Sequence, residues 1–368
     1  MIHYFTDVVV DEEIIRERNF KHSEAGYRRS MFVVASFAED YKVVSMASPE
    51  KKGYFKSKQS SVNEKFLYLA GFKLSPLLNA IVYNFIVLMY LLKNCKKEDK
   101  IIVYNLIPKQ IIGIYIYKLL FNNDLILQIE ELYSSKKGSK IKKICHGLLE
   151  KFLFKVSNKI VAVNSTILNK YKVSGLISYG YPPTISAEVL AAEKSDKENS
   201  YLLYSGRLDE DSGIINLIEA FIKSHTICEL WITGNGPLKS VILEASLLDS
   251  RIKYLGFLEE REYNRILNNS QACINTIETK SEFSKYSFPS KVLTYMSFHK
   301  PIITSYFNAL EDLPENMKGH LKIYKDDSVS ELVDLLNQFD SHTGVTYVDY
   351  KINEFFTEQS LKLRRFIA

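Results

Sequence analysis

Apolar and polar positions alternate along the first half of the chain in two rhythms. Short apolar runs typical of buried strands are separated by stretches with the period of amphipathic helices. This βα order predicts a parallel sheet covered by helices. The predicted strands are Ile2–Val10, Tyr41–Ala47, Lys100–Asn105, Leu125–Glu130 and Lys159–Val163, and the predicted helices are Arg28–Ala38, Gln110–Phe121, Lys140–Lys155 and Ser165–Tyr171.

The same alternation begins again at Tyr201, after a polar stretch, Thr184–Asn199, that has the composition of a connection between domains. We therefore predict an α/β protein with two doubly wound domains, at 1–185 and 186–345, and a C-terminal helix within 346–368 that packs back toward the first domain. The predicted strands of the second half are Tyr201–Ser205, Glu229–Thr233, Ile252–Tyr254, Ala272–Thr276 and Pro301–Thr304, and its helices are Ile214–Ser224, Leu238–Leu247, Glu260–Asn268 and Ser290–Phe298.

One segment, Leu74–Leu92, contains no charged residue and approaches the length of a membrane span. Pro76, Asn79 and Asn84 interrupt it. A buried or half-buried helix of the first sheet, an interfacial helix on a bilayer and a true span all fit the composition. We expect the first, because a span would remove a helix from the βα alternation.

The two halves of the chain carry net charges of opposite sign. Residues 1–185 carry 28 Lys and Arg against 16 Asp and Glu, a net +12, whereas residues 186–368 carry 20 against 27, a net −7. A basic half favours a polyanionic partner such as an anionic membrane face or a lipid diphosphate, although a solvated lysine-rich surface has the same composition. We expect no nucleic-acid partner, since no nucleic-acid-binding motif accompanies the lysines. The four cysteines are far apart and the first residues lack the pattern of a secretory signal, so we expect a cytoplasmic protein.

A first candidate site follows the strand that begins the second half. Gly206 permits a tight turn, and Arg207 at the end of a strand is placed to clamp phosphate oxygens. The alternative is a surface arginine paired with Asp209 or Asp211.

A second candidate is the segment Ser284–Met296, in which Pro289 and Ser290 are typical of a helix start. Free amides, the positive end of the helix dipole and Lys291 would together receive a diphosphate. An ordinary capped helix with a solvated lysine is the alternative.

Several motifs are absent or weak. Asp209-Glu210-Asp211 is more typical of an acidic helix start than of a metal site, so we expect no metal. Gly234-Asn235-Gly236 lacks the third glycine of a dinucleotide fingerprint. The chain contains no P-loop, no H-E-x-x-H and no G-x-S-x-G motif.

The second half resembles the donor-binding domain of glycosyltransferase family 4, retaining enzymes with the two-domain GT-B fold. The resemblance rests on four segments in family order: Leu202–Leu208 with Leu217–Phe221, Leu230–Leu238, Ile252–Leu258, and Phe288–Met296 with Lys300–Ile303. The first half resembles the acceptor domain more loosely, through Ser23–Gly26, Gln128–Tyr133, Ile160–Val163 and Tyr179–Pro183. The resemblance implies two Rossmann-like domains that face each other across a cleft.

The resemblance also implies roles for individual residues. Arg207 and Lys291 would act on the donor diphosphate, and Glu130 and Glu131 would orient the acceptor on the catalytic face. Ala25 and Gly26 would lie on the acceptor side. The donor-binding residues implied are Gly206, Gly234, Gly256, Phe257, Tyr286, Ser287, Phe288, Pro289, Ser290 and Thr294.

Three positions depart from the family pattern. Ser212 stands where members generally carry a lysine, and Tyr286 and Thr294 replace a pair of glutamates. A threonine hydroxyl cannot accept two ribose hydroxyls as a carboxylate does. We hypothesise that Lys291 supplies the missing positive charge from the opposite side.

The resemblance implies metal-independent transfer of a hexose, with retention, from a nucleotide diphosphate sugar, for which UDP is favoured. A lipid-linked or oligosaccharide acceptor in O-antigen or capsule synthesis fits the basic half, as does peripheral attachment to the inner face of the cell membrane. A catalytically silent partner subunit and a sugar-nucleotide epimerase of the same fold are the alternatives.

Overall fold

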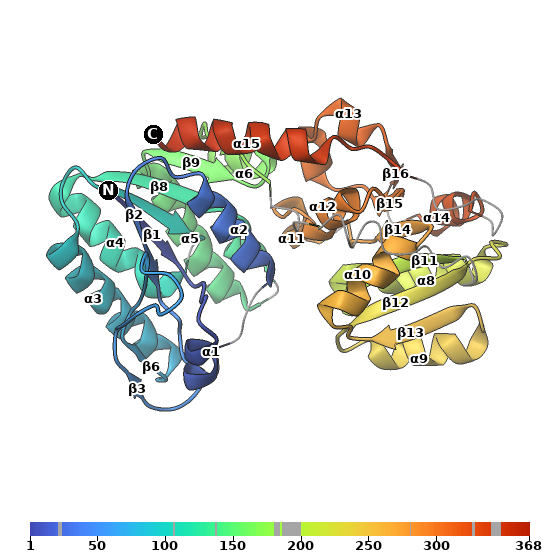
Figure 1. Cartoon of the computed structure of the whole chain (residues 1–368), viewed down its shortest axis with the longest axis horizontal. Helices are drawn as coiled ribbons and strands as arrows, with labels where there is room; N and C mark the ends of the chain where they lie inside the picture. Colours follow the sequence, from blue (N-terminus) through green and yellow to red (C-terminus); the bar gives the residue numbers. More distant parts are fainter. Residues whose placement is uncertain are drawn as a thin grey trace. The chain divides into compact units, whose positions relative to one another are not determined.

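The structure, a computed structural model, describes residues 1–20, 24–105, 107–136, 138–179, 185, 200–279, 281–325, 328–339 and 347–368. Two compact units make up the chain: unit 1 is Met1–Gly180 with Thr357–Ala368, and unit 2 is Tyr181–Phe356 (Figure 1). The predicted connection Thr184–Asn199 lies outside the described residues except for Ile185.

Unit 1 is built on a sheet with the strand order β10-β9-β8-β7-β1-β2-β5-β4, parallel except for the β4–β5 pair at its edge. Successive connections after β1 run toward β2 on one side, and those after β7 run toward β10 on the other. The strand order therefore reverses between β1 and β7. The strands are β1 (Ile2–Thr6), β2 (Tyr41–Ser45), β4 (Lys58–Gln59), β5 (Phe66–Tyr68), β7 (Lys100–Tyr104), β8 (Asp124–Ile129), β9 (Lys159–Ala162) and β10 (Leu176–Ile177), with a separate hairpin of β3 (Tyr54–Phe55) and β6 (Gly71–Phe72).

Helices cover this sheet, and α3 lies against α4 (Figure 1). The α3 helix is the segment predicted from the uncharged run, and among the described residues it is the one helix long and apolar enough to cross a membrane. One of its faces buries Tyr83, Val87 and Leu91 in the core of unit 1. The helices are α1 (Glu12–Arg18), α2 (Glu24–Ala35), α3 (Pro76–Asn94), α4 (Pro108–Phe121), the short η1 (Tyr133–Ser135), α5 (Lys140–Val156) and α6 (Ser165–Tyr171).

Unit 2 contains a six-stranded, fully parallel sheet with the order β13-β12-β11-β14-β15-β16. Numbered within the unit this is 3-2-1-4-5-6, the order of doubly wound dinucleotide-binding folds, with its reversal point between β11 and β14. The strands are β11 (Tyr201–Arg207), β12 (Glu229–Asn235), β13 (Ile252–Gly256), β14 (Ala272–Asn275), β15 (Ile302–Ser305) and β16 (Leu321–Tyr324). The predicted α/β class and doubly wound topology are confirmed.

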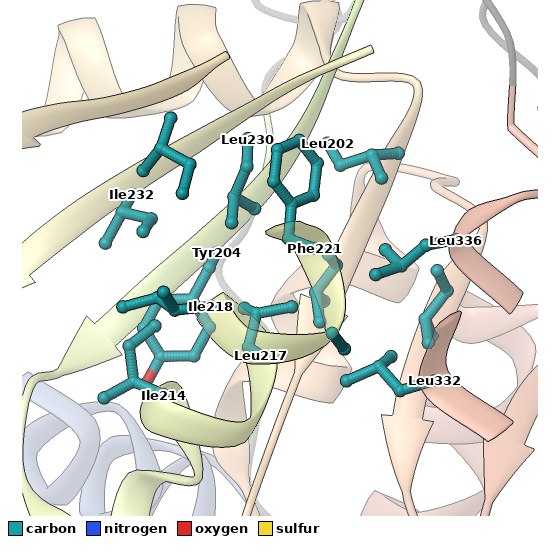
Figure 2. Close-up of a cluster of buried hydrophobic side chains, with 14 of the residues drawn as sticks. Leu202, Tyr204, Ile214, Leu217, Ile218, Phe221, Leu230, Ile232, Leu332 and Leu336 are labelled. Carbon is teal, nitrogen blue, oxygen red and sulfur yellow. The ribbon is translucent and has the colours of Figure 1, made fainter. Parts of the chain in front are cut away.

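The core of unit 2 forms where α8 packs against α14 and against the sheet (Figure 2). Leu217 and Phe221 of α8 meet Leu230 of β12 and Leu332 of α14, all of them fully buried. The helices of this unit are η2 (Glu210–Ser212), α8 (Ile214–Lys223), α9 (Lys239–Leu248), α10 (Glu260–Asn269), α11 (Glu282–Lys285), α12 (Ser290–Ser297), η3 (Asn308–Asp312), α13 (Glu315–Lys318) and α14 (Val329–Leu336).

The last helix, α15 (Ile352–Ile367), begins with residues of unit 2, and from Thr357 onward it belongs to unit 1. There its Ser360 hydroxyl lies 3.2 Å from that of Ser36. All four cysteines are free thiols; Cys95, Cys228 and Cys273 are buried and Cys145, on α5, is exposed.

Candidate functional site

The first cluster of functional side chains lies at the reversal point of the unit 2 sheet. Ligands of open parallel sheets collect outside the carboxyl ends of the strands at this point, where the connections diverge and leave a hollow. Here β11 ends in Gly206 and Arg207, and α12, which leads into β15, begins at Ser290. The two sequence candidates therefore lie in the same region of one unit.

Lys291 joins these two segments. An ideal Cβ built on Gly206 would lie 1.5 Å from Lys291 Nζ, so the ammonium group rests directly against the backbone of β11. The same nitrogen lies 5.2 Å from the centroid of the Tyr204 ring. Among the described residues this half-buried ammonium has no hydrogen-bonding or ion-pairing partner.

The surroundings of Lys291 disfavour its charge. Burial, together with the positive charge of Arg207, lowers the pKa of Lys291 from 10.5 to about 8, and Asp209 opposes the shift only partly. An ammonium held beside a guanidinium without a carboxylate of its own is a site that a bound anion would stabilise.

Arg207 is the exposed partner in this cluster. Its side chain is 73% accessible, and Nη2 lies 3.0 Å from Asp209 Oδ2. The ion pair named as the alternative interpretation is thus present in the structure. Exposed pairs of this kind contribute about 0–1 kcal/mol, so a diphosphate could readily take the place of Asp209.

The start of α12 supplies backbone donors. Pro289 is its N-cap residue and no side chain caps the helix, so the first-turn amides at Ser290 and Lys291 remain available to a ligand. Tyr286 ends the preceding α11, and the ring of Phe288 packs edge-on against Phe307, 5.7 Å between centroids. Ser287, predicted to bind the donor, lies in the same connection.

Two of the three positions that depart from the family pattern, Ser212 and Thr294, are occupied by buried hydroxyl groups. Thr294 is buried in α12, and its hydroxyl lies 3.5 Å from the Ser290 carbonyl oxygen. Ser212 donates a hydrogen bond to the Asp209 carbonyl oxygen. Both hydroxyls therefore contact backbone oxygens, and neither supplies a charge.

Two glycines open the backbone beside Arg207. Gly206 and Gly234 are register partners on β11 and β12, and Gly234 has a φ of 137°. A Cβ on Gly234 would lie 1.7 Å from the Gly206 carbonyl oxygen, so no other residue fits. Gly256, at the end of β13, has a φ of 73° but open space around it, and the ring of the adjacent Phe257 is 78% exposed. An exposed aromatic ring beside open backbone is suited to stacking on a flat base.

A second cluster lies at the reversal point of the unit 1 sheet. A cavity of ≈ 210 Å³ opens there, between the ends of β1, β7 and β8 and the helix α2. It brings together Gly26 and Glu131, which were predicted from the sequence, and Asp7, which was not. The cavity is lined by Thr6, Asp7, Val8, Phe20, Gly26, Tyr27, Tyr104, Asn105, Ile107, Glu131 and Tyr133.

The structure places the two adjacent glutamates, Glu130 and Glu131, in different surroundings. Glu131 lines the cavity and pairs with Lys136, 2.5 Å between Oε1 and Nζ. Glu130 does not line it; its Oε1 lies 2.5 Å from Nε of the buried Arg29 and accepts a hydrogen bond from Gln128. Glu130 is thus held in a buried polar network of unit 1. Of Ala25 the structure gives only its place in α2.

Potential metal ligands gather at one place in the described part of the chain. His3, Cys95 and Asp99 lie together near the amino ends of β1 and β7. The His3 nitrogens already face Asp99 at 3.3 Å and the Tyr90 hydroxyl at 3.0 Å. Asp99 also accepts hydrogen bonds from the Lys96 amide and the N-terminal ammonium, so this cluster serves the core as a satisfied hydrogen-bond network rather than as an open site.

Sequence reasoning missed Asp7, Asn105 and Tyr133 as cavity residues. The available signal was positional: Asp7 breaks an apolar run where β1 ends, and Asn105 directly follows β7. Burial raises the pKa of Asp7, although Lys109, Arg18 and the Ser48 amide act in the opposite direction. Carboxylates with raised pKa values in cavities are candidates for functional groups.

The fold is that of the GT-B glycosyltransferases. Solved structures that resemble the whole chain include HepE (Alr3699) of Anabaena in complex with UDP, at 13% identity and TM-score 0.66 over 99% of this chain and 97% of that one. The lipopolysaccharide outer core galactosyltransferase WaaB is similar, at 15% identity and TM-score 0.65 over 100% and 98% of the two chains. The UDP-forming α,α-trehalose-phosphate synthase of Burkholderia xenovorans, in complex with glucose-6-phosphate, matches at 9% identity and TM-score 0.68 over 100% and 98%.

Residues 199–339 match the family described as "Glycosyl transferases group 1". A search of curated protein sequences finds no match. The expected glycosyltransferase resemblance and GT-B fold are confirmed.

Proposed function

We propose that the chain is a retaining glycosyltransferase that moves a hexose from a UDP-sugar to a hydroxyl group of a lipid-linked or oligosaccharide acceptor. The observation that carries this proposal is the ammonium of Lys291, which rests against Gly206 beside Arg207 without an anionic partner among the described residues. A diphosphate would supply the missing negative charge. The complexes of HepE with UDP and with UDP-glucose support the choice of nucleotide by analogy of fold.

The chemistry follows from the charges. As the bond between the anomeric carbon and the β-phosphate oxygen breaks, negative charge grows on the leaving diphosphate. Arg207, Lys291 and the first amides of α12 stabilise this charge, and losing one such donor typically costs on the order of 10²–10³ in rate. The acceptor oxygen bonds to the anomeric carbon on the same face, and its proton passes to the departing phosphate oxygen. No metal ion is needed, because fixed cations and amides already neutralise the diphosphate.

The experiment is a panel of UDP, GDP, dTDP and CMP sugars, tested by thermal shift on the full chain in the presence of EDTA. Stabilisation by UDP-sugars, followed by turnover to a product with retained anomeric configuration, is the expected result. Stabilisation without turnover would favour the silent partner subunit, and release of an altered sugar nucleotide without acceptor would favour the epimerase. No response to any nucleotide would contradict the proposal.

We also propose that unit 1 attaches to an anionic membrane through the docking face, a set of exposed apolar side chains on α3, α4 and α5. On α3 these side chains recur every fourth residue and point away from the core. Lysines follow the end of α3 and begin α5, as at Lys97 and Lys140. The docking face comprises Leu77, Ile81, Phe85, Met89, Ile112, Ile116, Leu119, Leu120, Ile141, Ile144 and Leu148.

An apolar stripe flanked by lysines is typical of helices that lie in the interfacial layer of an anionic bilayer. Such attachment would bring the enzyme to a lipid-linked acceptor and supports a role in surface polysaccharide synthesis, O-antigen or capsule, at the inner face of the membrane. Sedimentation with phosphatidylglycerol vesicles at low salt, weakened at high salt, is expected. Phe85→Ser should reduce it, whereas Leu247→Ser on α9 of unit 2, also exposed, should not. Binding that ignores salt and both substitutions would contradict the attachment.

A further inference from the structure

The cavity of unit 1 has a composition that identifies the kind of ligand it takes. Its polar lining consists of two carboxylates, Asp7 and Glu131, the amide of Asn105, the hydroxyl of Thr6 and three tyrosines. No lysine or arginine lines it among the described residues. Two cations lie near the lining: Lys136 pairs with Glu131 and lies over the Tyr133 ring, and Lys109, whose charge acts on Asp7, lies over the Tyr83 ring.

Individual polar groups are fixed in place by the strands that carry them. The Asn105 side chain is buried, and its Oδ1 accepts a hydrogen bond from the Glu130 amide at 2.8 Å. This orientation leaves Nδ2 without a partner among the described residues. Among the described residues, Asp7 accepts a hydrogen bond only from the Ser48 amide, at 3.4 Å, so most of its acceptor capacity is available. Buried polar groups with unused capacity are costly unless a ligand or water meets them.

The apolar part of the lining is mostly aromatic, with Val8 and Ile107 as its aliphatic members. Phe20, Tyr27, Tyr104 and Tyr133 contribute rings, and these rings offer flat apolar surfaces next to the carboxylates. Vicinal hydroxyls donate well to carboxylates, and the C–H faces of a pyranose ring pack on aromatic rings. A phosphate group, by contrast, would meet two carboxylates and, among the described residues that line the cavity, no cation. At ≈ 210 Å³ the cavity is smaller than the roughly 300–1,000 Å³ of drug-sized pockets, which is room for one sugar unit.

We propose that this cavity binds the terminal sugar of the acceptor, and that this sugar is an unphosphorylated pyranose whose hydroxyls donate to Asp7 and Glu131. The proposal rests on the proposed function for its statement that the bound sugar is the acceptor. It adds the chemical class of the acceptor terminus, and it makes Asp7 a binding residue. The aromatic rings would hold the ring face, and Nδ2 of Asn105 would donate to a ring or hydroxyl oxygen.

The test is saturation-transfer NMR on the full chain with methyl α-D-glucopyranoside, methyl α-D-galactopyranoside and methyl α-D-mannopyranoside as probes, each compared with the corresponding free hexose 6-phosphate. At least one uncharged glycoside should show transfer, and it should bind at least fivefold more tightly than its phosphorylated counterpart. Asp7→Asn and Glu131→Gln should each weaken that binding at least fivefold. Glu12→Gln, an exposed glutamate of the same unit, is the matched control and should leave it unchanged.

Tighter binding of a hexose 6-phosphate, glycoside binding that both cavity variants retain, or no binding of any probe would overturn the proposal. UDP-sugar binding, measured by thermal shift on the same variants, separates this outcome from failure of the proposed function. If glycosides fail while UDP-sugars bind and turn over, the acceptor class is wrong and the glycosyltransferase remains. If glycosides bind in this cavity while no nucleotide sugar binds, the cavity stands and the proposed function fails.

Discussion

The ammonium group of Lys291 occupies the space in which a side chain on Gly206 would lie, 1.5 Å from the ideal Cβ position. The two residues come from β11 and from the start of α12, 85 positions apart in the chain. Glycine at 206 is therefore required for the position of the cation and not for an unusual backbone angle, since its φ is not positive.

Gly206→Ala should weaken donor binding while the fold persists. The obstacle is the far end of a flexible side chain, so Lys291 can move away at little cost in stability. We expect a loss of about tenfold in UDP-sugar affinity, or about 1.4 kcal/mol, measured by calorimetry. Lys291→Met should cost at least as much, and the double variant should be no worse than Lys291→Met alone. Additive losses would show that Gly206 and Lys291 act independently.

Donor affinity should depend on pH through Lys291. Its pKa is lowered to about 8, so the ammonium is present below that pH and is lost as pH rises through it. Because the diphosphate binds the charged form, affinity should be level below pH 7 and fall above pH 8, by up to tenfold per unit. A UDP-sugar is the right probe, since its diphosphate lacks the terminal phosphate ionisation near pH 6. Lys291→Met should abolish the decline; a decline that persists in this variant would assign it to another group.

Two glycines of the same sheet edge should respond very differently to alanine. Gly234→Ala places a Cβ 1.7 Å from the Gly206 carbonyl oxygen, so β11 and β12 must separate. At Gly256 a Cβ would meet open space, so Gly256→Ala should lower the stability only through the strain of the positive φ, by about 1–2 kcal/mol. Urea unfolding should show a loss several kcal/mol larger at 234 than at 256. Equal losses would mean that strain, and not contact, sets the cost.

Substitutions at the neighbouring Glu130 and Glu131 should also differ in their effect on stability. Glu130→Gln leaves the buried Arg29 without its ion-pair partner, which typically costs about 3–5 kcal/mol for a fully buried pair. Since the Glu130 side chain is 16% accessible, we expect the lower end of that range. Glu131→Gln breaks a partly exposed pair and should change stability by less than about 1 kcal/mol. A large loss of stability in Glu131→Gln would contradict this division.

The hydrophobic pattern predicted the sheets well where strands are continuous apolar runs, as at β7, β8 and β11. It overextended β1, which ends at Thr6 rather than at Val10, because Asp7 and the residues after it turn along the cavity. It missed β3, β4 and β6, two-residue strands that depend on tertiary pairing.

A buried Arg18 illustrates the limit of sequence reasoning here. Its charge predicts exposure, but its guanidinium donates hydrogen bonds to the carbonyl oxygens of Ala47, Leu69 and Lys56 and holds the region around these short strands together. No local pattern signals that arrangement.

The donor-side candidates were accessible to sequence reasoning because strand ends and helix starts carry recognisable turn chemistry. The distinction between Glu130 and Glu131 was not, because adjacent identical residues differ only in the neighbours that the fold gives them. Glu130 contacts Arg29 and Gln128, whereas Glu131 pairs with Lys136 and lines the cavity.

The distribution of cysteines gives the chain a built-in reporter. Three thiols are sealed in the cores, and burial raises the pKa of Cys95 to about 11 and of Cys273 to about 12, so neither forms a thiolate at neutral pH. Cys145 alone is exposed, on α5 between Ile144 and His146. A maleimide fluorophore would therefore label the natural sequence at one position beside the docking face, next to Ile144, and its emission would report directly how deeply that helix enters a bilayer.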